Sequence, residues 1–166
     1  MITVISGTSR EDSMTRRVAH VYEHLLLERG EKPRFLSLEG LPVWERTQPL
    51  LHTETEVLIP AKKFIFVVPE YNGSIPGVLK VLLDNTDIQK AWWGKKAMIT
   101  GLADGRAGNL RGLDHLTNIL NYLKVSVYWN KIPLSRIRTE ITEDGDFRLE
   151  ATRRAVVDQL EGFLHF

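Results

Sequence analysis

The sequence predicts an α/β fold, a three-layer sandwich whose five-stranded parallel sheet, in the order 2-1-3-4-5, carries helices on both faces. Apolar runs rich in β-branched residues alternate five times with stretches of helical periodicity, as in sheets built from crossover units. Right-handed crossovers leave few topologies, and this order suits five strands. The clustered Gly, Ser, Thr and Asn residues follow strands 1, 3 and 4, so these loops should meet at the switch point where such sheets bind ligands.

Residues 1–61 are predicted to contain two strands and two helices. An apolar run at 2–6 predicts the first strand, and a 3.6-residue apolar stripe predicts a helix from about Ser13 to Arg29, stopped by Gly30. The second strand is expected at 34–38. The proline-containing stretch 39–51 is interpreted as a loop, and 53–61 as a short helix.

The most informative stretch is 62–83. Its apolar run 64–68 predicts a central strand covered on both faces, ending at Pro69 because proline cannot donate to a sheet ladder. A polar loop follows, and Ser74 is expected to cap a helix whose first turn contains Pro76. Later segments predict strands at 96–100 and 125–128 and helices at 110–123 and 147–163.

Length, cysteine content and charge exclude several classes of fold, chemistry and binding partner. The 166 residues predict one domain spanning 1–166, and the absence of cysteine excludes disulfides and thiolate chemistry. With 22 basic and 21 acidic residues, the charge balance indicates neither a nucleic-acid nor a membrane partner. No signal-peptide pattern occurs, and no apolar stretch approaches the roughly 20 residues that span a bilayer, so a cytoplasmic location is expected.

The loop after the first strand contains hydroxyls and an arginine at the start of a helix. Backbone N–H groups and the helix dipole favour a phosphate there, and the side chains that could bind it are Thr8, Ser9, Arg10, Ser13 and Thr15. The alternative is that Ser13 or Asp12 only caps the helix, and the carboxylates of Glu11 and Asp12 would repel a phosphate. Neither a Walker A loop nor a GxGxxG fingerprint is present, which favours a mononucleotide.

Three segments resemble one known family. The block PEYNGSIPGVLK at 69–80 is similar to the signature of the NAD(P)H-dependent FMN reductases, which have a flavodoxin-like fold. The first loop resembles their GSxRxxSxNxxLA pattern at Gly7, Thr8, Arg10, Ser13, Thr15, Val18 and Ala19. The loop after the fourth strand resembles GxxxGRxGG, with Asn109 in place of the last glycine.

The resemblance implies an FMN-dependent oxidoreductase that takes hydride from NADPH or NADH. Electrons would pass to a small acceptor such as a quinone, free flavin, azo dye or metal ion, without catalytic side chains or a resident metal. Relatives form homodimers or homotetramers, and at least a dimer is expected here. The implied FMN-binding residues are Thr8, Ser9, Arg10, Ser13, Thr15, Pro69, Glu70, Tyr71, Asn72, Gly73, Ser74, Gly101, Asp104, Gly105 and Arg106.

Within that set, individual roles follow from the same resemblance. Hydroxyls and Arg10 of the first loop would hold the phosphate, while 69–74 and 101–108 would border the flavin ring. Backbone N–H groups of 71–74 and 101–108 would stabilise charge on the reduced ring. Tyr71 would either stack on the ring or pack across a subunit contact.

Other functions remain open from the residues alone. One alternative is an electron carrier, although such carriers are usually strongly acidic; another is a binding or regulatory module without flavin. His20-Val21-Tyr22-Glu23-His24 matches H-x-x-E-H, but both histidines are expected to face solvent rather than hold zinc. Trp92 and Trp93 lie among lysines, and a rim or interface position is favoured over stacking on nucleic-acid bases.

Overall fold

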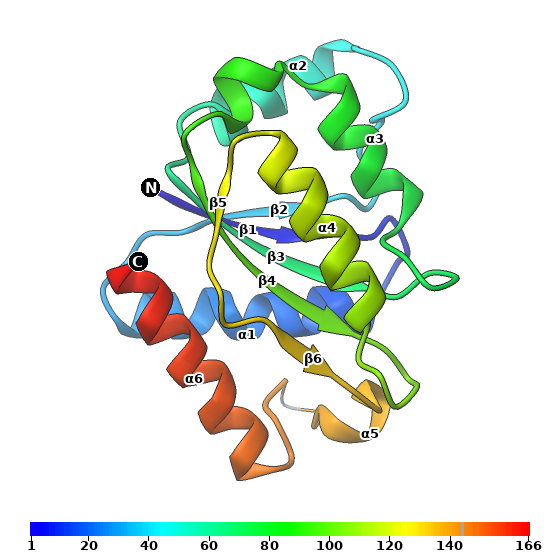
Figure 1. The fold of residues 1–166 in the computed structure, drawn as a ribbon, viewed down its shortest axis with the longest axis vertical. Helices are drawn as coiled ribbons and strands as arrows, with labels where there is room; N and C mark the ends of the chain where they lie inside the picture. The colour runs from blue at the N-terminus through cyan, green and yellow to red at the C-terminus, as the bar shows by residue number, and fades with distance from the viewer. Residues whose placement is uncertain (144) are drawn as a thin grey trace.

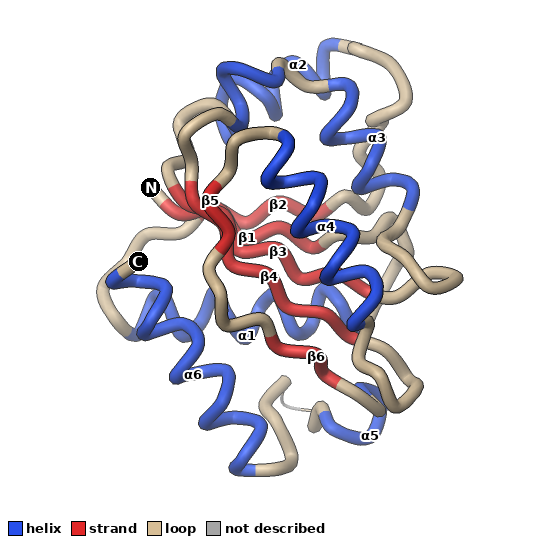
Figure 2. The backbone as a smooth tube through the Cα atoms, in the orientation of Figure 1, coloured by secondary structure: helices blue, strands red, loops and turns tan. Residues whose placement is uncertain are grey.

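A computed structural model of the chain describes residues 1–143 and 145–166. Its sheet contains β1 (Ile2–Ser6), β2 (Arg34–Ser37), β3 (Lys63–Pro69), β4 (Lys96–Leu102) and β5 (Ser126–Val127), and the strands lie in the order β2-β1-β3-β4-β5 (Figure 2). Every pairing is parallel. The predicted order is therefore confirmed.

The fifth position of the sheet differs from the prediction of one strand at 125–128. Two short segments pair with β4 there: β5 beside Lys96 and Ala97, and β6 (Ile132–Leu134) beside the stretch from Thr100 to Leu102. Between them the ladder is interrupted, so the backbone near Ile99 needs another partner.

A side chain of α6 (Glu150–His165) fills that interruption. The buried Gln159 amide donates to the carbonyls of Ile99, at 3.2 Å, and Asn130, at 2.9 Å. Its oxygen accepts from Tyr22 at 2.6 Å and from Thr100 at 3.1 Å. One amide thus joins two helices to the sheet edge and satisfies polar groups that burial would otherwise penalise.

Helices cover both faces of the sheet, as predicted (Figure 1). On one face α1 (Met14–Glu28), α5 (Ile137–Glu140) and α6 pack on the side chains of Val4, Ile65 and Met98. On the other face α3 (Gly77–Asn85) and α4 (Leu110–Tyr122) pack on a cluster that includes Phe64, Phe66 and Ile99. Within the described ranges, no helix combines the length and apolar character needed to cross a membrane.

The segment 39–61 contains more helix than predicted. Its helix begins at Gln48 rather than Thr53, with α2 (Gln48–Thr53) running into the π-helical turn η1 (Glu54–Leu58). Pro49 lies in the first turn of α2, where the missing N–H costs nothing, so interpreting it as a loop residue was wrong. The buried carboxylate of Glu54 anchors the segment by binding Arg46, at 2.9 Å, and the Asp87 N–H.

Two further predictions of local structure were wrong. Ser74 does not cap α3, because the helix begins at Gly77 and Pro76 holds the N-cap position. Trp92, at the end of the π-helical turn η2 (Ile88–Trp92), is a core residue that packs on Phe64 at 5.0 Å between ring centroids. Trp93 is the exposed member of the pair, with the Lys124 ammonium 3.6 Å from its ring centroid.

Lys95 gives the fold a pH-dependent stability. Its ammonium donates to the carbonyls of Leu58 and Ile59, and burial lowers its pKa to about 8. The unfolded chain binds the proton up to about pH 10.4, so between about pH 8 and 10 the unfolded state holds more protons and stability rises with pH. Lys95→Met should remove this rise. Urea unfolding of both proteins across that window measures it, and a stability difference that stays constant with pH would contradict it.

Candidate functional site

The carboxyl ends of β1, β3 and β4 meet at one edge of the sheet, where they shape a cavity of about 210 Å³. The cavity lies between the loop that enters α1, the end of β3, the loop after β4 and α5. It is lined by Arg10, Glu11, Asp12, Ser13, Met14, Thr15, Pro69, Glu70, Tyr71, Leu102, Ala103, Asp104, Ile137 and Arg138. We call this cavity the sheet-edge site.

The N-terminus of α1 forms one wall of the sheet-edge site. Ser13 is the N-cap, and its Oγ accepts from the Arg16 N–H at 3.1 Å, so the capping role considered for Ser13 is confirmed. Helix geometry leaves the N–H groups of Met14 and Thr15 without an intrahelical acceptor. They lie at the positive end of the helix dipole, where an anion is stabilised.

Thr8, in the loop between β1 and α1, is hydrogen-bonded to Tyr71. The two hydroxyls are 2.5 Å apart, Thr8 is buried, and its Oγ1 also accepts from the Arg10 N–H at 3.2 Å. The Arg10 guanidinium lies 4.2 Å from the centroid of the Tyr71 ring, a cation–π contact. Tyr71 therefore packs within its own chain, on the first loop.

The loop after β3 is a tight turn rather than an open strand end. Tyr71 and Ser74 exchange backbone hydrogen bonds of 2.9 and 3.1 Å, and Asn72 and Gly73 between them have φ values of 52° and 78°. Two positive φ angles are what a type I′ turn requires, and Asn-Gly is its preferred sequence. The N–H groups of Tyr71 and Ser74 are used inside the turn. Of the four N–H groups of residues 71–74, those of Asn72 and Gly73 therefore remain to face a ligand.

Glycines set the path of the loop after β4. A Cβ on Gly101 would lie 2.6 Å from the Gly108 carbonyl, and one on Gly108, where φ is +56°, would lie 2.4 Å from the Pro133 carbonyl carbon. Asn109 has φ of 72° and donates to the Val68 carbonyl at 2.9 Å. Asparagine tolerates this conformation, which explains why it can replace the last glycine of the pattern.

The structure separates the predicted site residues into groups. Seven of them line the sheet-edge site: Arg10, Ser13, Thr15, Pro69, Glu70, Tyr71 and Asp104. Ser74 instead faces α4, where its Oγ is 2.8 Å from His115 Nδ1, and Arg106 lines a neighbouring cleft. Arg16 is close enough in sequence to the first loop to reach a phosphate, but it forms an ion pair with Glu39 at 2.9 Å and does not line the cavity.

Two lining residues come from α5, which the sequence did not predict. Ile137 donates its N–H to the Ala103 carbonyl, and Arg138 forms an ion pair with Asp104 at 2.9 Å. These contacts hold the loop after β4 against α5. A four-residue helix has too few positions to show a periodic pattern, so no sequence signal could have placed them.

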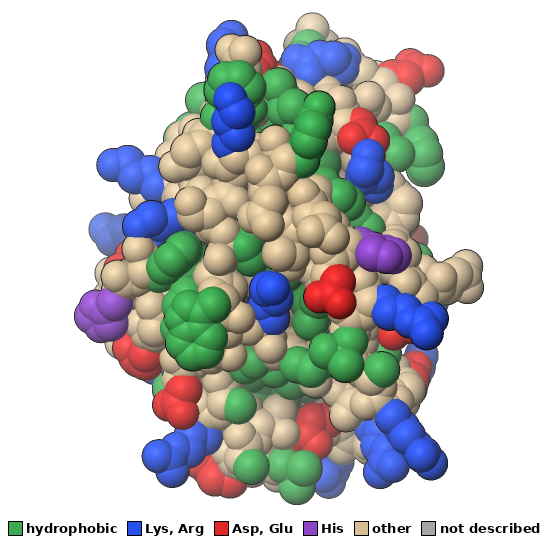
Figure 3. All heavy atoms as spheres, in the orientation of Figure 1, with side chains coloured by type: hydrophobic (Ala, Val, Ile, Leu, Met, Phe, Trp, Pro, Cys, Tyr) green, Lys and Arg blue, Asp and Glu red, His purple; other side chains and the backbone are tan. Residues whose placement is uncertain are grey.

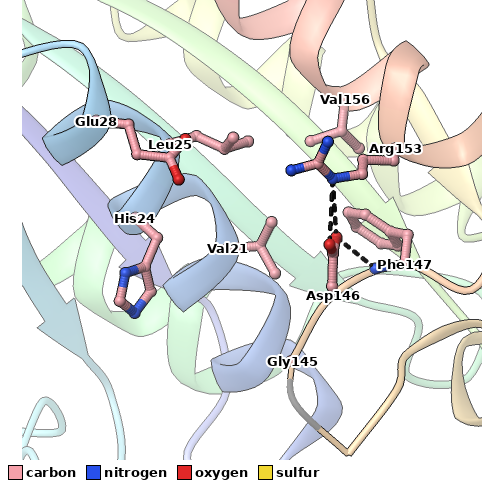
Figure 4. Close-up of a pocket in the computed structure, with 9 residues that line it drawn as sticks. All are labelled: Val21, His24, Leu25, Glu28, Gly145, Asp146, Phe147, Arg153 and Val156. Carbon is pink, nitrogen blue, oxygen red and sulfur yellow. Dashed lines mark hydrogen bonds and ion pairs between the residues drawn. The ribbon is translucent and has the colours of Figure 1, made fainter. Parts of the chain in front are cut away.

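A separate cavity of about 270 Å³ lies between the second half of α1, α6 and the segment before α6 (Figure 4). Two carboxylates line it: Asp146, which forms an ion pair with Arg153 at 3.1 Å, and Glu28 of α1. His24 lines it and is exposed, and His20 stacks on Phe35 at 4.2 Å while its side chain stays 42% exposed, so both histidines point away from the core as expected. Among the described residues no group of three potential metal ligands occurs.

The known proteins that this chain resembles are reductases. Residues 1–135 match the family model described as NADPH-dependent FMN reductase. A curated 2-hydroxy-1,4-benzoquinone reductase from a Burkholderia species is 29% identical over 163 residues, covering 92% of this chain and 88% of its own.

Among solved structures, FerB from Paracoccus denitrificans, a flavoenzyme NAD(P)H:(acceptor) oxidoreductase, superposes with a TM-score of 0.81 at 22% identity. It covers 99% of this chain and 94% of its own. A mutant flavodoxin from Pseudomonas aeruginosa has a TM-score of 0.63 at 17% identity, covering 99% and 96%. These likenesses confirm the flavodoxin-like fold.

Proposed function

Because this chain belongs to the NADPH-dependent FMN reductase family, and is thus an NAD(P)H oxidoreductase that works through FMN, we propose that its acceptor is a quinone. The similarity to a 2-hydroxy-1,4-benzoquinone reductase over most of both chains supports a quinone over a free flavin, azo dye or metal ion. The observation that carries the proposal is the sheet-edge site, which places the N-terminus of α1 beside the end of β3 and the loop after β4.

The donors at the sheet-edge site fit FMN. Its phosphate suits the hydroxyls of Ser13 and Thr15 and the N–H groups at the start of α1. Arg10 adds a positive charge at the same wall, whereas Glu11 and Asp12 lie exposed at the rim. Because the Thr8 hydroxyl is already engaged by Tyr71, a phosphate that uses Thr8 has to compete with that bond.

Bound FMN supplies hydride acceptance and electron transfer, and the protein supplies position and electrostatics. In our proposal the N–H groups of Asn72 and Gly73 and those of the loop after β4 face the polar edge of the ring. They would stabilise negative charge that develops there. Thr8 and Arg10 would orient Tyr71 beside the ring.

We also propose that the enzyme is a homo-oligomer. A cavity of about 210 Å³ is below the roughly 300–1,000 Å³ typical of ligand sites, so part of the flavin must lie outside it. A second copy could cover that part. Trp44, Tyr122 and Trp129 are each at least 70% exposed and offer aromatic contact surface. A cytoplasmic location, where NAD(P)H is plentiful, remains part of the proposal.

An FMN titration followed by anaerobic addition of NADPH or NADH tests the function. We expect saturable binding, bleaching of the flavin absorbance by the nicotinamide nucleotide, and its return when a benzoquinone is added. Bleaching without recovery would contradict a quinone acceptor. FMN binding without bleaching would favour an electron carrier, and no FMN binding would favour a flavin-free module.

A further inference from the structure

A second concave surface lies on the other side of the loop after β4. It has a volume of about 670 Å³, within the range of small-molecule sites. Three arginines from separate segments line it: Arg106 in the loop after β4, Arg136 before α5, and Arg148 before α6. We call it the arginine cleft. Figure 3 shows Lys and Arg side chains gathered at the lower right, where Figure 1 places α5 and this loop.

The arginine cleft carries an excess of positive charge. Within 1–143 and 145–166, none of its three guanidinium groups forms an ion pair. Glu140 is the one carboxylate among the described residues that line the cleft, and it accepts the Leu149 N–H at 3.3 Å, which occupies it at the start of α6. Positive charge without a matching carboxylate favours an anionic ligand.

Hydrogen bonds to neighbouring backbone carbonyls hold Arg136 and Arg148 in place at the cleft. Arg148 Nε donates to the Thr139 carbonyl at 3.0 Å, which orients its guanidinium and leaves the terminal nitrogens available. The Arg136 N–H donates to the Gly105 carbonyl at 3.2 Å. The hydroxyls of Ser135 and Thr152 also line the cleft and can donate to phosphate oxygens. A phosphate monoester matches these donors better than a carboxylate, because it has three acceptor oxygens.

The cleft and the sheet-edge site share α5 and the loop after β4. Ile137 and Arg138 line the sheet-edge site, whereas Arg136 and Thr139 line the cleft. A ligand whose reactive end lies at the sheet-edge site could therefore extend across the loop into the cleft. The residues of α5 and the segment before α6 lie beyond the part matched by the family model, which ends at 135.

We infer that the arginine cleft binds the adenosine end of the nicotinamide nucleotide and selects NADPH over NADH through its 2′-phosphate. This inference rests on the proposed function, in which the nicotinamide reaches a flavin at the sheet-edge site. NADPH differs from NADH only by that phosphate monoester, the group for which the cleft has unpaired donors.

The test compares the two nucleotides in three variants of the FMN-loaded protein. In Arg136→Gln and Arg148→Gln, kcat/KM for NADPH should fall roughly 10- to 100-fold, the loss expected for one charge-assisted hydrogen bond, whereas kcat/KM for NADH should change less than about twofold. Arg154→Gln is the matched control, because Arg154 is an exposed arginine of α6 outside the cleft. It should leave both values unchanged.

Calorimetry with 2′,5′-ADP gives a readout independent of turnover. The unsubstituted protein should bind 2′,5′-ADP more tightly than 5′-ADP, and both cleft variants should lose that difference. Equal losses for NADPH and NADH, or 2′,5′-ADP binding unaffected by the variants, would overturn the inference. If the FMN-loaded protein oxidised neither nucleotide, the proposed function would fail, while calorimetry would still decide the cleft. Melting temperatures of the variants identify any that are misfolded.

Discussion

Ser13→Asp should weaken FMN binding about 100-fold while leaving the protein as stable as before. Ser13 caps α1 and lines the sheet-edge site, so its two roles must be separated. Aspartate caps a helix as well as serine does, and stability should change by less than about 0.5 kcal/mol. Its carboxylate would replace a hydroxyl donor with a charge that repels the phosphate, a loss of roughly 3 kcal/mol. Fluorescence titration with FMN and urea unfolding measure the two effects.

Two control variants separate the effect of the added charge from the effect of changing the helix cap. Ser126→Asp adds the same charge at the opposite, amino-terminal edge of the sheet, beside Lys96, and should not alter FMN affinity. Ser13→Ala should cost about 1 kcal/mol of stability because the cap is lost. Unchanged FMN affinity in Ser13→Asp would show that the phosphate does not lie at the start of α1.

Gly108→Ala should be among the most destabilising single substitutions in the site loops. A Cβ there would lie 2.4 Å from the carbonyl carbon and 2.7 Å from the carbonyl oxygen of Pro133, and φ is +56°. Both contacts are with backbone, which cannot move away as a flexible side chain can. Strain and overpacking together should cost roughly 2–4 kcal/mol, measured by urea unfolding.

Gly105→Ala is the matched control from the same loop. A Cβ at Gly105 meets no atom within 4 Å, and its φ is not in the left-handed region, so stability should change by less than about 0.5 kcal/mol. If Gly108→Ala lost as little stability as Gly105→Ala, the loop would tolerate a moved backbone. In that case the close approach to Pro133 would not be what requires glycine at 108.

The strand order and the position of the site could be predicted because their signals are local. The run 64–68 is apolar on both faces of the sheet, which only a covered central strand explains. Pro69 marks the end of the strand before the polar loop, and Ser13 marks a helix start. Each signal depends on a few adjacent residues, so no knowledge of distant contacts is needed.

The wrong and missing predictions depend on contacts between distant parts of the chain. A pair of aromatic residues before a buried strand favours a rim or interface position, yet the ring of Trp92 enters the core beside Phe64. Lys95 lies over that same phenyl ring. Serine is a common helix-capping residue, but Ser74 instead forms a hydrogen bond with His115 on α4. The arginine cleft joins residues 106, 136 and 148, whose spacing forms no motif.

Gln159 also constrains how the chain reaches its folded state. The amide closes the gap in the sheet ladder only when α1 and α6 are both docked, and its partner Tyr22 is 137 positions away in sequence. Closing a loop of that length costs more conformational entropy than closing a shorter one, so we expect this contact to form after the shorter-range ones. The edge of the sheet that supports the loop after β4 is therefore completed by a non-local step of folding. We therefore expect the sheet-edge site and the arginine cleft to be completed after the central strands have paired.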